Sequence, residues 1–284
     1  MKNPLVSVVI PVYNGGKYLQ KALDSVNSQS YQNIEYVIVN DGSTDETADI
    51  IFACKNGKNN IVVLNHAKNE GFVKSLNDGV LSASGKYIAR LDADDVWLDP
   101  QKIEKQVEFL EKNTGYVLCG GGVVIVEEKN NNEVGRYLFP EQDNQIRKSL
   151  LGYNLFAHSS VVFLKSPFLE IKGYDAEYGF FADADLWLKM GGLGKLYNFQ
   201  EYFVQYLDKE YSNKKYVSRD DQIRRKFLLR CKMKWKYRKE YPGILKAIFL
   251  SFSSYIYSFL PLKTKIKPLL FKIRTRLLGS PYHY

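Results

Sequence analysis

The sequence contains few cysteines and no long hydrophobic run. Its 284 residues include three cysteines, which lie far apart and form no Cys-x-x-Cys pair. A disulfide scaffold and a zinc ribbon are therefore excluded, and a reducing compartment is expected. The apolar stretch at residues 5–13 is too short and too rich in β-branched residues for a signal peptide, which predicts that the protein is not secreted. The uncharged stretch at residues 247–262 falls short of the roughly 20 residues that span a bilayer.

Acidic charge is scarce at the C-terminal end. Residues 209–284 hold 20 of the 40 Lys and Arg but only four of the 31 Asp and Glu, a net charge of +16. Residues 1–208 hold the other 20 basic and 27 acidic residues, a net charge of −7. This asymmetry predicts a polyanionic partner, either a membrane surface or a nucleic acid. Because the basic region lacks a recognisable nucleic-acid-binding motif, we expect no nucleic acid.

The basic tail has the pattern of an interfacial membrane anchor. Lys and Arg alternate with aromatic and aliphatic residues at 219–240 and again at 263–278. Such a segment lies on an anionic membrane with its apolar side chains in the interface. The alternative is that the tail packs on the rest of the protein as ordinary helices with a solvated basic face.

Apolar runs alternate with helical patterns along the first 126 residues. Two helix starts are indicated, one at Ser43, which forms a capping box with Glu46, and one at Pro100. The alternation predicts an α/β fold with a mostly parallel sheet flanked by helices over residues 1–208, followed by a basic helical extension over 209–284. Strands are expected at residues 6–12, 34–39, 61–64, 87–91 and 116–126.

Polar residues follow several of these strands directly. Asn14, Asp41 and the acidic cluster at 92–95 each come just after an apolar run. In open parallel sheets, ligands bind beyond the carboxyl ends of the strands. We therefore expect these residues to converge on one edge of the sheet.

The cluster Asp92-Ala93-Asp94-Asp95 is the sharpest chemical feature. Three carboxylates in four positions repel one another unless a cation lies among them. Hard carboxylate oxygens suit Mg²⁺ or Mn²⁺, which also take phosphate oxygens as ligands. The alternative is a solvated acidic turn in which Asp95 caps a helix.

Other polar motifs have ordinary structural interpretations beside functional ones. The segment 41–45 is a turn and helix cap, or it places Asp41 against a nucleobase. Asp183 and Asp185 cap an apolar helix, or one of them is a general base. His158 is a structural histidine or a member of a binding pocket. No nucleophile with a matching base is found, which disfavours Ser-His-Asp hydrolysis.

Taken in order, five motifs resemble those of the family 2 glycosyltransferases, inverting enzymes of the GT-A fold. The resemblance covers residues 5–208. The motifs are Pro11-Val-Tyr-Asn14, Asp41-Gly-Ser-Thr-Asp45, Asn69-Glu-Gly71, Asp92-Ala-Asp-Asp95 and Ala182-Asp-Ala-Asp-Leu-Trp-Leu-Lys189.

The resemblance implies a role for each motif. Nucleotide-sugar contacts are implied for Pro11, Tyr13, Asn14, Asp41, Asn69, Asp92 and Ala93. It implies Asp94 as the ligand of Mn²⁺ or Mg²⁺ and Asp183 as the catalytic base. Donor- or acceptor-pocket candidates are His158, Asp185 and Trp187.

The chain departs from the family pattern at three points. The usual Glu before the catalytic Asp is Ala182, and the usual Arg after the helix is Lys189. The Arg-x-His turn that often follows the last strand is absent from Tyr206-Leu-Asp-Lys209.

These observations predict an inverting, metal-dependent transfer from a nucleoside-diphosphate sugar, with UDP as the expected nucleotide. The expected acceptor is a saccharide. If the tail binds a membrane, this acceptor is expected to be lipid-linked, for example on a polyprenyl carrier, as in cell-surface polysaccharide synthesis. The expected location is cytoplasmic, peripheral on the inner face of the inner membrane. The alternative is a non-catalytic membrane-surface binding module with a degenerate sugar-nucleotide fold.

Overall fold

The computed structural model describes residues 3–56, 60–208 and 220–259. The chain divides into two compact units. The first comprises Met1–Ile146 and Leu155–Glu210, and the second Arg147–Asn154 and Tyr211–Tyr284. The boundary expected at residue 208 thus lies close to the division, but Arg147–Asn154 joins the C-terminal unit because it packs there, with Gly152 against Leu250.

The described part of the first unit is built on a nine-stranded sheet. The strand order is β3-β2-β1-β4-β8-β6-β9-β5, with β7 pairing with β6. The sheet is parallel from β3 to β4 and mixed beyond it, since β8 runs antiparallel to both β4 and β6. The strands are β1 Val6–Val12, β2 Ile34–Asn40, β3 Ile61–Asn65, β4 Tyr87–Arg90, β5 Val96–Trp97, β6 Tyr116–Glu127, β7 Glu133–Tyr137, β8 Val162–Leu164 and β9 Lys195–Asp208.

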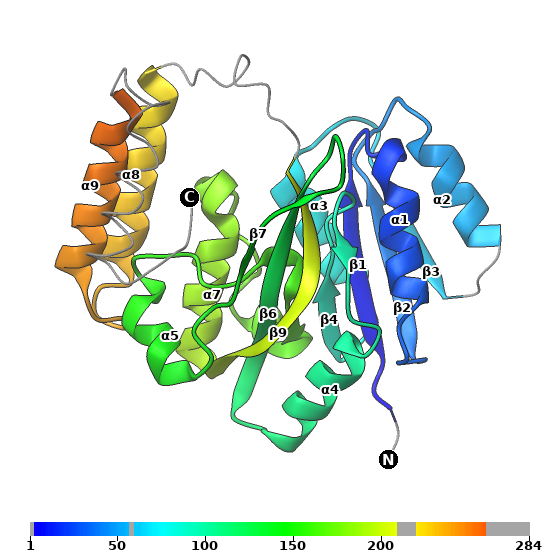
Figure 1. Ribbon diagram of the computed structural model, residues 1–284, viewed down its shortest axis with the longest axis horizontal. Coiled ribbons are helices and arrows are strands. Elements are labelled where there is room, and N and C mark those ends of the chain that lie inside the picture. The colour runs from blue at the N-terminus through cyan, green and yellow to red at the C-terminus, as the bar shows by residue number, and fades with distance from the viewer. Residues whose placement is uncertain (1–2, 57–59, 209–219, 260–284) are drawn as a thin grey trace. The chain divides into compact units, whose positions relative to one another are not determined.

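Helices flank this sheet, so the predicted α/β fold is confirmed. Figure 1 shows α1 on one side of β1 and β2, with α2 next to α1, and α3 on the other side. Strands β1 and β2 are buried at every position because helices cover both of their faces, which explains their nearly unbroken apolar sequences. The helices are α1 Gly16–Asn27, α2 Thr47–Asn56, α3 Phe72–Ser82, α4 Lys102–Lys112, α5 Asp143–Leu150, α6 Lys165–Glu170 and α7 Ala182–Leu193, with 3₁₀ turns at His158–Ser160 and Ala176–Phe181.

The predicted helix start at Ser43 is wrong. Helix α2 begins at Thr47, whose backbone N–H donates to Asp45 Oδ1 at 3.1 Å. Ser43 Oγ instead accepts a hydrogen bond from the backbone N–H of Asn14 at 3.0 Å. Ser43 therefore joins two loops, and the cap moves two residues along the chain.

Asp95 does not cap a helix either. It is followed by the short strand β5, and α4 begins only at Lys102, two residues after Pro100. Asp95 is buried, so the solvated acidic turn considered for this cluster is wrong for its last member.

The second unit contains a pair of packed helices. Helices α8 (Asp220–Lys236) and α9 (Ile244–Phe259) lie side by side (Figure 1). They are antiparallel, since Phe227 stacks on Tyr255 while Lys234, further along α8, donates to the Ala247 carbonyl near the start of α9. The rest of the predicted basic extension lies outside the described residues. Within the part of the chain that the structure describes, no helix is long and apolar enough to cross a membrane.

Candidate functional site

The loops that follow β1 and β2 are tied to each other. Asn14, in the left-handed conformation at φ 47°, accepts a hydrogen bond at Oδ1 from the backbone N–H of Thr44 at 2.8 Å. The backbone N–H of Gly16 donates to Asp45 Oδ2 at 3.0 Å. These contacts bring the first two sequence motifs together at the carboxyl ends of adjacent parallel strands. Tyr13 lies beside them with half of its surface exposed.

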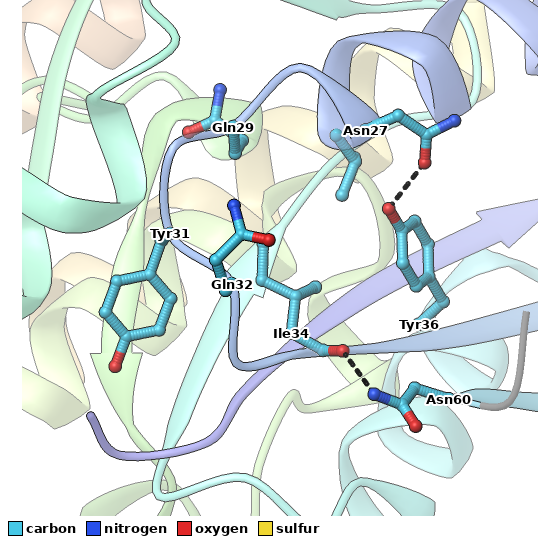
Figure 2. A pocket seen from close by; sticks show the side chains of 8 residues that line it. Asn27, Gln29, Tyr31, Gln32, Ile34, Tyr36 and Asn60 are labelled. Carbon is cyan, nitrogen blue, oxygen red and sulfur yellow. Dashed lines mark hydrogen bonds between the residues drawn. The ribbon is translucent and has the colours of Figure 1, made fainter. Parts of the chain in front are cut away.

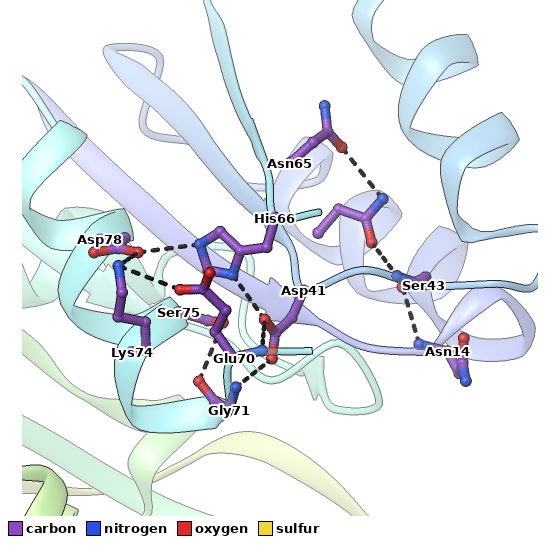
Figure 3. A network of polar contacts seen from close by, with 11 residues as sticks. Asn14, Asp41, Ser43, Asn65, His66, Glu70, Gly71, Lys74, Ser75 and Asp78 are labelled. Atoms are coloured by element: carbon purple, nitrogen blue, oxygen red, sulfur yellow. Dashed lines mark hydrogen bonds and ion pairs between the residues drawn. The ribbon is translucent and has the colours of Figure 1, made fainter. Parts of the chain in front are cut away.

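Asp41 connects these loops to the third motif. Its carboxylate accepts hydrogen bonds from the backbone N–H of Glu70 at 2.8 Å and of Gly71 at 2.9 Å (Figure 3). The loop can approach because Gly42 has a φ of 72° and a side chain there would collide with the backbone of Lys68. The neighbouring Asn69 remains exposed at the same edge.

Sequence reasoning missed His66, which follows β3 and completes the environment of Asp41. Its Nδ1 lies 2.7 Å from Asp41 Oδ1, and its Nε2 lies 3.0 Å from Asp78 Oδ2 (Figure 3). Burial raises the pKa of Asp41, but the hydrogen bonds from His66 and the two backbone N–H groups outweigh it and hold this pKa below its ordinary value. The same bond to Asp41 raises the pKa of His66.

The group formed by His66, Glu70 and Asp78 has ligand atoms within 4.8 Å of one another. It already contains a cation, because Lys74 forms ion pairs with Asp78 and, at 3.6 Å, with Glu70. Lys74 therefore offsets part of the charge of these carboxylates, and we interpret the group as support for Asp41.

The acidic cluster lies next to the first loop. A Cβ atom built on Gly15 would lie 3.6 Å from Ala93 Cβ, so the loop after β1 contacts the segment after β4. The hydroxyl of Ser159 organises the cluster: it accepts a hydrogen bond from the backbone N–H of Asp92 at 2.9 Å and donates to the Asp95 carboxylate. Ser159 comes from a 3₁₀ turn 67 residues away.

The electrostatics of this cluster favour a cation. Burial, together with the charges of Asp92 and Asp94, raises the pKa of Asp95 well above its ordinary value. Asp92 and Asp94 are only partly buried. Oxygen ligands at such a position fit Mg²⁺ or Mn²⁺, and Asp92 and Asp94 are the more exposed carboxylates of the cluster.

Arg90 lies beneath the cluster and was also missed. This last residue of β4 is 1% exposed, and its Nη2 donates to Asp92. Its guanidinium lies 5.3 Å from the centre of the Phe72 ring. Among the described residues, Nε and Nη1 have no hydrogen-bond partner. The available signal was a charged residue inside the otherwise apolar run at 87–91.

The structure places the three pocket candidates below the surface. Trp187 and Asp185 have no exposed area, and His158 is buried. The His158 ring contacts Trp187 edge to face, with Nε2 2.8 Å from the Tyr174 hydroxyl. Asp185 pairs with Lys189 at 2.9 Å. These side chains form the layer under the site, and their assignment to a donor or acceptor pocket stays a prediction.

His158 is held neutral in that layer. Burial, assisted by the charge of Arg90, lowers its pKa well below the ordinary value. Tyr174 is buried beside it, and burial raises the pKa of this phenol, as do the charges of Asp183 and Asp92. Tyr174 therefore lies within electrostatic range of both carboxylates.

Asp183 occupies the first turn of α7. Its Oδ1 accepts a hydrogen bond from the backbone N–H of Ala184 at 2.7 Å, and the side chain is partly buried. The positive end of the helix dipole favours its ionised form. Direct contacts join the loop at Asn14, the acidic cluster and the 3₁₀ turn at Ser159, and the charge of Asp183 acts on Tyr174, which contacts His158 of that turn.

A separate cavity lies at the other end of β2. It has a volume of about 420 Å³ and is lined mainly by amides and tyrosines, including Asn27, Tyr36 and Asn60 (Figure 2). Ile34, the first residue of β2, also lines it, whereas the polar loops follow the last residues of the strands. It contains none of the motif residues and is not the candidate active site.

Solved structures of similar chains identify the fold. S. aureus TarS 1-349 in complex with UDP superposes with a TM-score of 0.65 at 18% identity, covering 94% of this chain and 78% of that one. Mannosyltransferase PcManGT from Pyrobaculum calidifontis, in complex with GDP-Man and Mn²⁺, gives a TM-score of 0.60 at 17% identity, covering 99% and 77%. The fold is that of the GT-A glycosyltransferases.

The sequence comparisons identify the family. The family described as "Glycosyl transferase family 2" matches residues 7–172, and the chain belongs to this family. An uncharacterized glycosyltransferase of Haemophilus influenzae is 33% identical over 211 residues, covering 72% of this chain and 65% of the relative. The putative glycosyltransferase EpsE of Bacillus subtilis is 33% identical over 208 residues, covering 70% and 71%. The chain thus spans slightly less than two thirds of the Haemophilus relative.

Proposed function

We propose that this protein transfers a sugar from a nucleoside-diphosphate donor to a saccharide acceptor, with inversion at the anomeric carbon. The observation that carries the proposal is the meeting of four sequence motifs, spread over more than 80 residues, at one edge of the sheet. Family membership favours this transfer over a non-catalytic membrane-binding module.

The nucleotide is assigned to the loops after β1, β2 and β3. Asp41 and the backbone around Asn14 form its polar wall, and the exposed side chains of Tyr13 and Asn69 flank it. Pro11 lies in β1 directly before this loop. UDP is the proposed nucleotide, in keeping with the UDP bound by TarS in its structure.

The diphosphate is assigned to the acidic cluster. Asp92 and Ala93 face the ribose and diphosphate, and Asp94 would hold Mn²⁺ or Mg²⁺ there. When bound, such an ion neutralises the charge that develops on the leaving diphosphate. The Mn²⁺ in the PcManGT structure supports this choice of ion.

Asp183 is assigned as the general base. Its partly buried carboxylate at the helix N-terminus would accept the proton of the acceptor hydroxyl as that oxygen attacks the anomeric carbon. A single displacement inverts the configuration, so an α-linked donor gives a β-linked product. Binding both substrates in line supplies much of the rate.

The acceptor is proposed to be a saccharide on a lipid carrier, as in cell-surface polysaccharide synthesis. The net charge of +16 in residues 209–284 supports a location on an anionic membrane surface. In this proposal the protein is peripheral on the cytoplasmic face of the inner membrane.

Donor hydrolysis tests the transfer proposal. The purified chain is incubated with UDP-, GDP- and dTDP-sugars, with and without Mn²⁺, and release of the nucleoside diphosphate is followed. We expect slow, metal-dependent release from one donor, and loss of the metal dependence in Asp94→Asn. Asp49→Asn, which removes an exposed carboxylate from α2, is the matched control and should behave as the wild type.

Two results would contradict this assignment. Full metal-dependent release by Asp94→Asn would remove Asp94 as the metal ligand. An absence of release together with an absence of nucleotide binding by calorimetry would favour the binding module instead.

A further inference from the structure

Helix α9 exposes its apolar side. Its four large exposed apolar residues are 46–83% exposed and are spaced four, three and four positions apart: Leu245, Phe249, Phe252 and Ile256. At 3.6 residues per turn, this spacing places them within about a sixth of the helix circumference. The buried side of the helix carries Ala247, Leu250 and Ser251. An ordinary surface helix buries its apolar stripe, whereas four of the large apolar side chains here are exposed.

Helix α8 contributes positive charge beside this face. Its exposed side, over about a third of the circumference, carries basic residues together with Leu228 and Trp235. The exposed basic residues there are Arg224, Arg225, Lys232 and Lys236.

The exposed sides of the two helices border the same surface of the pair, although their directions diverge by about 90°. Lys234 of α8 donates to Ala247 and Ser251 of α9 at 2.6 Å, which fixes the sides by which the helices touch. Around each helix axis, the middle of the exposed side lies about 130–140° from that contact. The helices are antiparallel, so the two rotations run in opposite directions when both helices are viewed from one end. Both exposed sides therefore border one surface of the pair.

We propose that this surface of α8 and α9 binds an anionic lipid bilayer, with the apolar stripe of α9 in the interface and the basic side chains of α8 at the lipid phosphates. The proposal deepens the membrane association proposed above and rests on it. Charge complementarity selects the partner, because an apolar stripe flanked by Arg and Lys matches the acyl boundary and anionic headgroups of a leaflet. In this proposal the two helices lie on the surface of the bilayer; no helix among the described residues is long and apolar enough to cross it.

Vesicle flotation of the full chain, without donor, tests this surface. We expect flotation with vesicles that contain phosphatidylglycerol and none with pure phosphatidylcholine vesicles. In the double variant Leu245→Ser/Phe249→Ser, the fraction of protein that floats with the vesicles should fall about tenfold or more, since two large apolar side chains are removed from the interface. Phe52→Ser, which alters an aromatic residue that is 68% exposed on α2, is the matched control and should float normally.

The charge contribution is tested in parallel. Arg224→Glu/Arg225→Glu should abolish flotation, whereas Lys21→Glu/Lys55→Glu, on the exposed sides of α1 and α2, should not. Trp235 supplies a spectroscopic readout, because it is 58% exposed while Trp97 and Trp187 are buried. Its fluorescence should shift to the blue when anionic vesicles are added, and Trp235→Phe should remove the shift.

Three results would overturn the proposal. Flotation unaffected by Leu245→Ser/Phe249→Ser, with a lowered melting temperature, would mean that the chain itself covers the stripe. A change from dimer to monomer in this variant, seen by sedimentation, would mean that a second copy covers it. Equal binding to neutral vesicles would remove the role of charge. Donor hydrolysis measured without vesicles reports on transfer separately, so failure of the two proposals is distinguishable.

Discussion

The guanidinium of Arg90, which is buried, donates a hydrogen bond to the partly exposed carboxylate of Asp92. One N–H group is used in this bond, while Nε and Nη1 have no partner among the described residues. Burying unpaired donors costs free energy, so the site keeps this cation at a penalty to folding. We interpret Arg90 as a positioning residue that fixes Asp92 and keeps His158 neutral.

Replacement of Arg90 by Met should therefore affect binding more than folding. Loss of the ion pair is offset by removal of two unpaired donors, and Asp92 is exposed enough to be solvated. We expect a change in unfolding free energy of about 1 kcal/mol or less, but a roughly tenfold loss of donor affinity. The pKa of His158 should rise, which NMR titration measures. A large stability loss with unchanged donor affinity would contradict this role.

His66 should stabilise the protein more at acidic than at alkaline pH. The Asp41 and Asp78 carboxylates face it, and its pKa is raised above 6.5, so its contribution is complete below that pH and is lost as the pH rises through the folded-state value. Wild type should exceed His66→Gln by about 1 kcal/mol more at pH 6 than at pH 9, measured by urea unfolding. Both proteins contain His158, so its opposite contribution cancels. A difference independent of pH would contradict the prediction.

Lys102 should have the reverse dependence. It is wholly buried in α4, with Nζ 2.8 Å from Gln106 Oε1 and 4.1 Å from the centre of the Trp97 ring. Burial lowers its pKa to about 7. Between that value and about 10, only the unfolded chain is protonated, so stability rises with pH by about 1.4 kcal/mol per unit. Lys102→Met should lack this rise in denaturant titrations at pH 7 and 9; parallel curves would mean that Lys102 stays charged.

Asp183→Asn should separate chemistry from binding. As the proposed base, Asp183 acts on the acceptor hydroxyl, so kcat for transfer should fall by about a hundredfold or more. Nucleoside-diphosphate affinity, measured by calorimetry, should stay within about twofold because the proposed nucleotide contacts come from other loops. Asp175→Asn, which removes a nearby carboxylate charge but keeps the Oδ1 acceptor that caps the preceding 3₁₀ turn, is the control and should retain turnover. Normal turnover by Asp183→Asn would exclude this base.

Much of the fold was predictable because its signals are local. The strand β1 was expected at residues 6–12 and is found there, since a run of β-branched residues between polar breaks specifies a buried strand. The start of α2 was misplaced because Ser43 has a distant partner, Asn14, that a capping pattern does not reveal. The surroundings of Trp187 could not be predicted either, because they come from other segments, such as Phe156 and His158.

The sequence by itself determined which residues carry charge and where strands and helices alternate, and this was enough to bring Asp41 and Asp92 to one edge of a sheet. Only the tertiary structure decided their partners. His66 joins Asp41 across 25 positions, and Ser159 joins Asp92 across 67. Hydrophobic periodicity depends on neighbours a few residues apart, whereas pairing inside a site depends on which distant segments the packed core brings into contact.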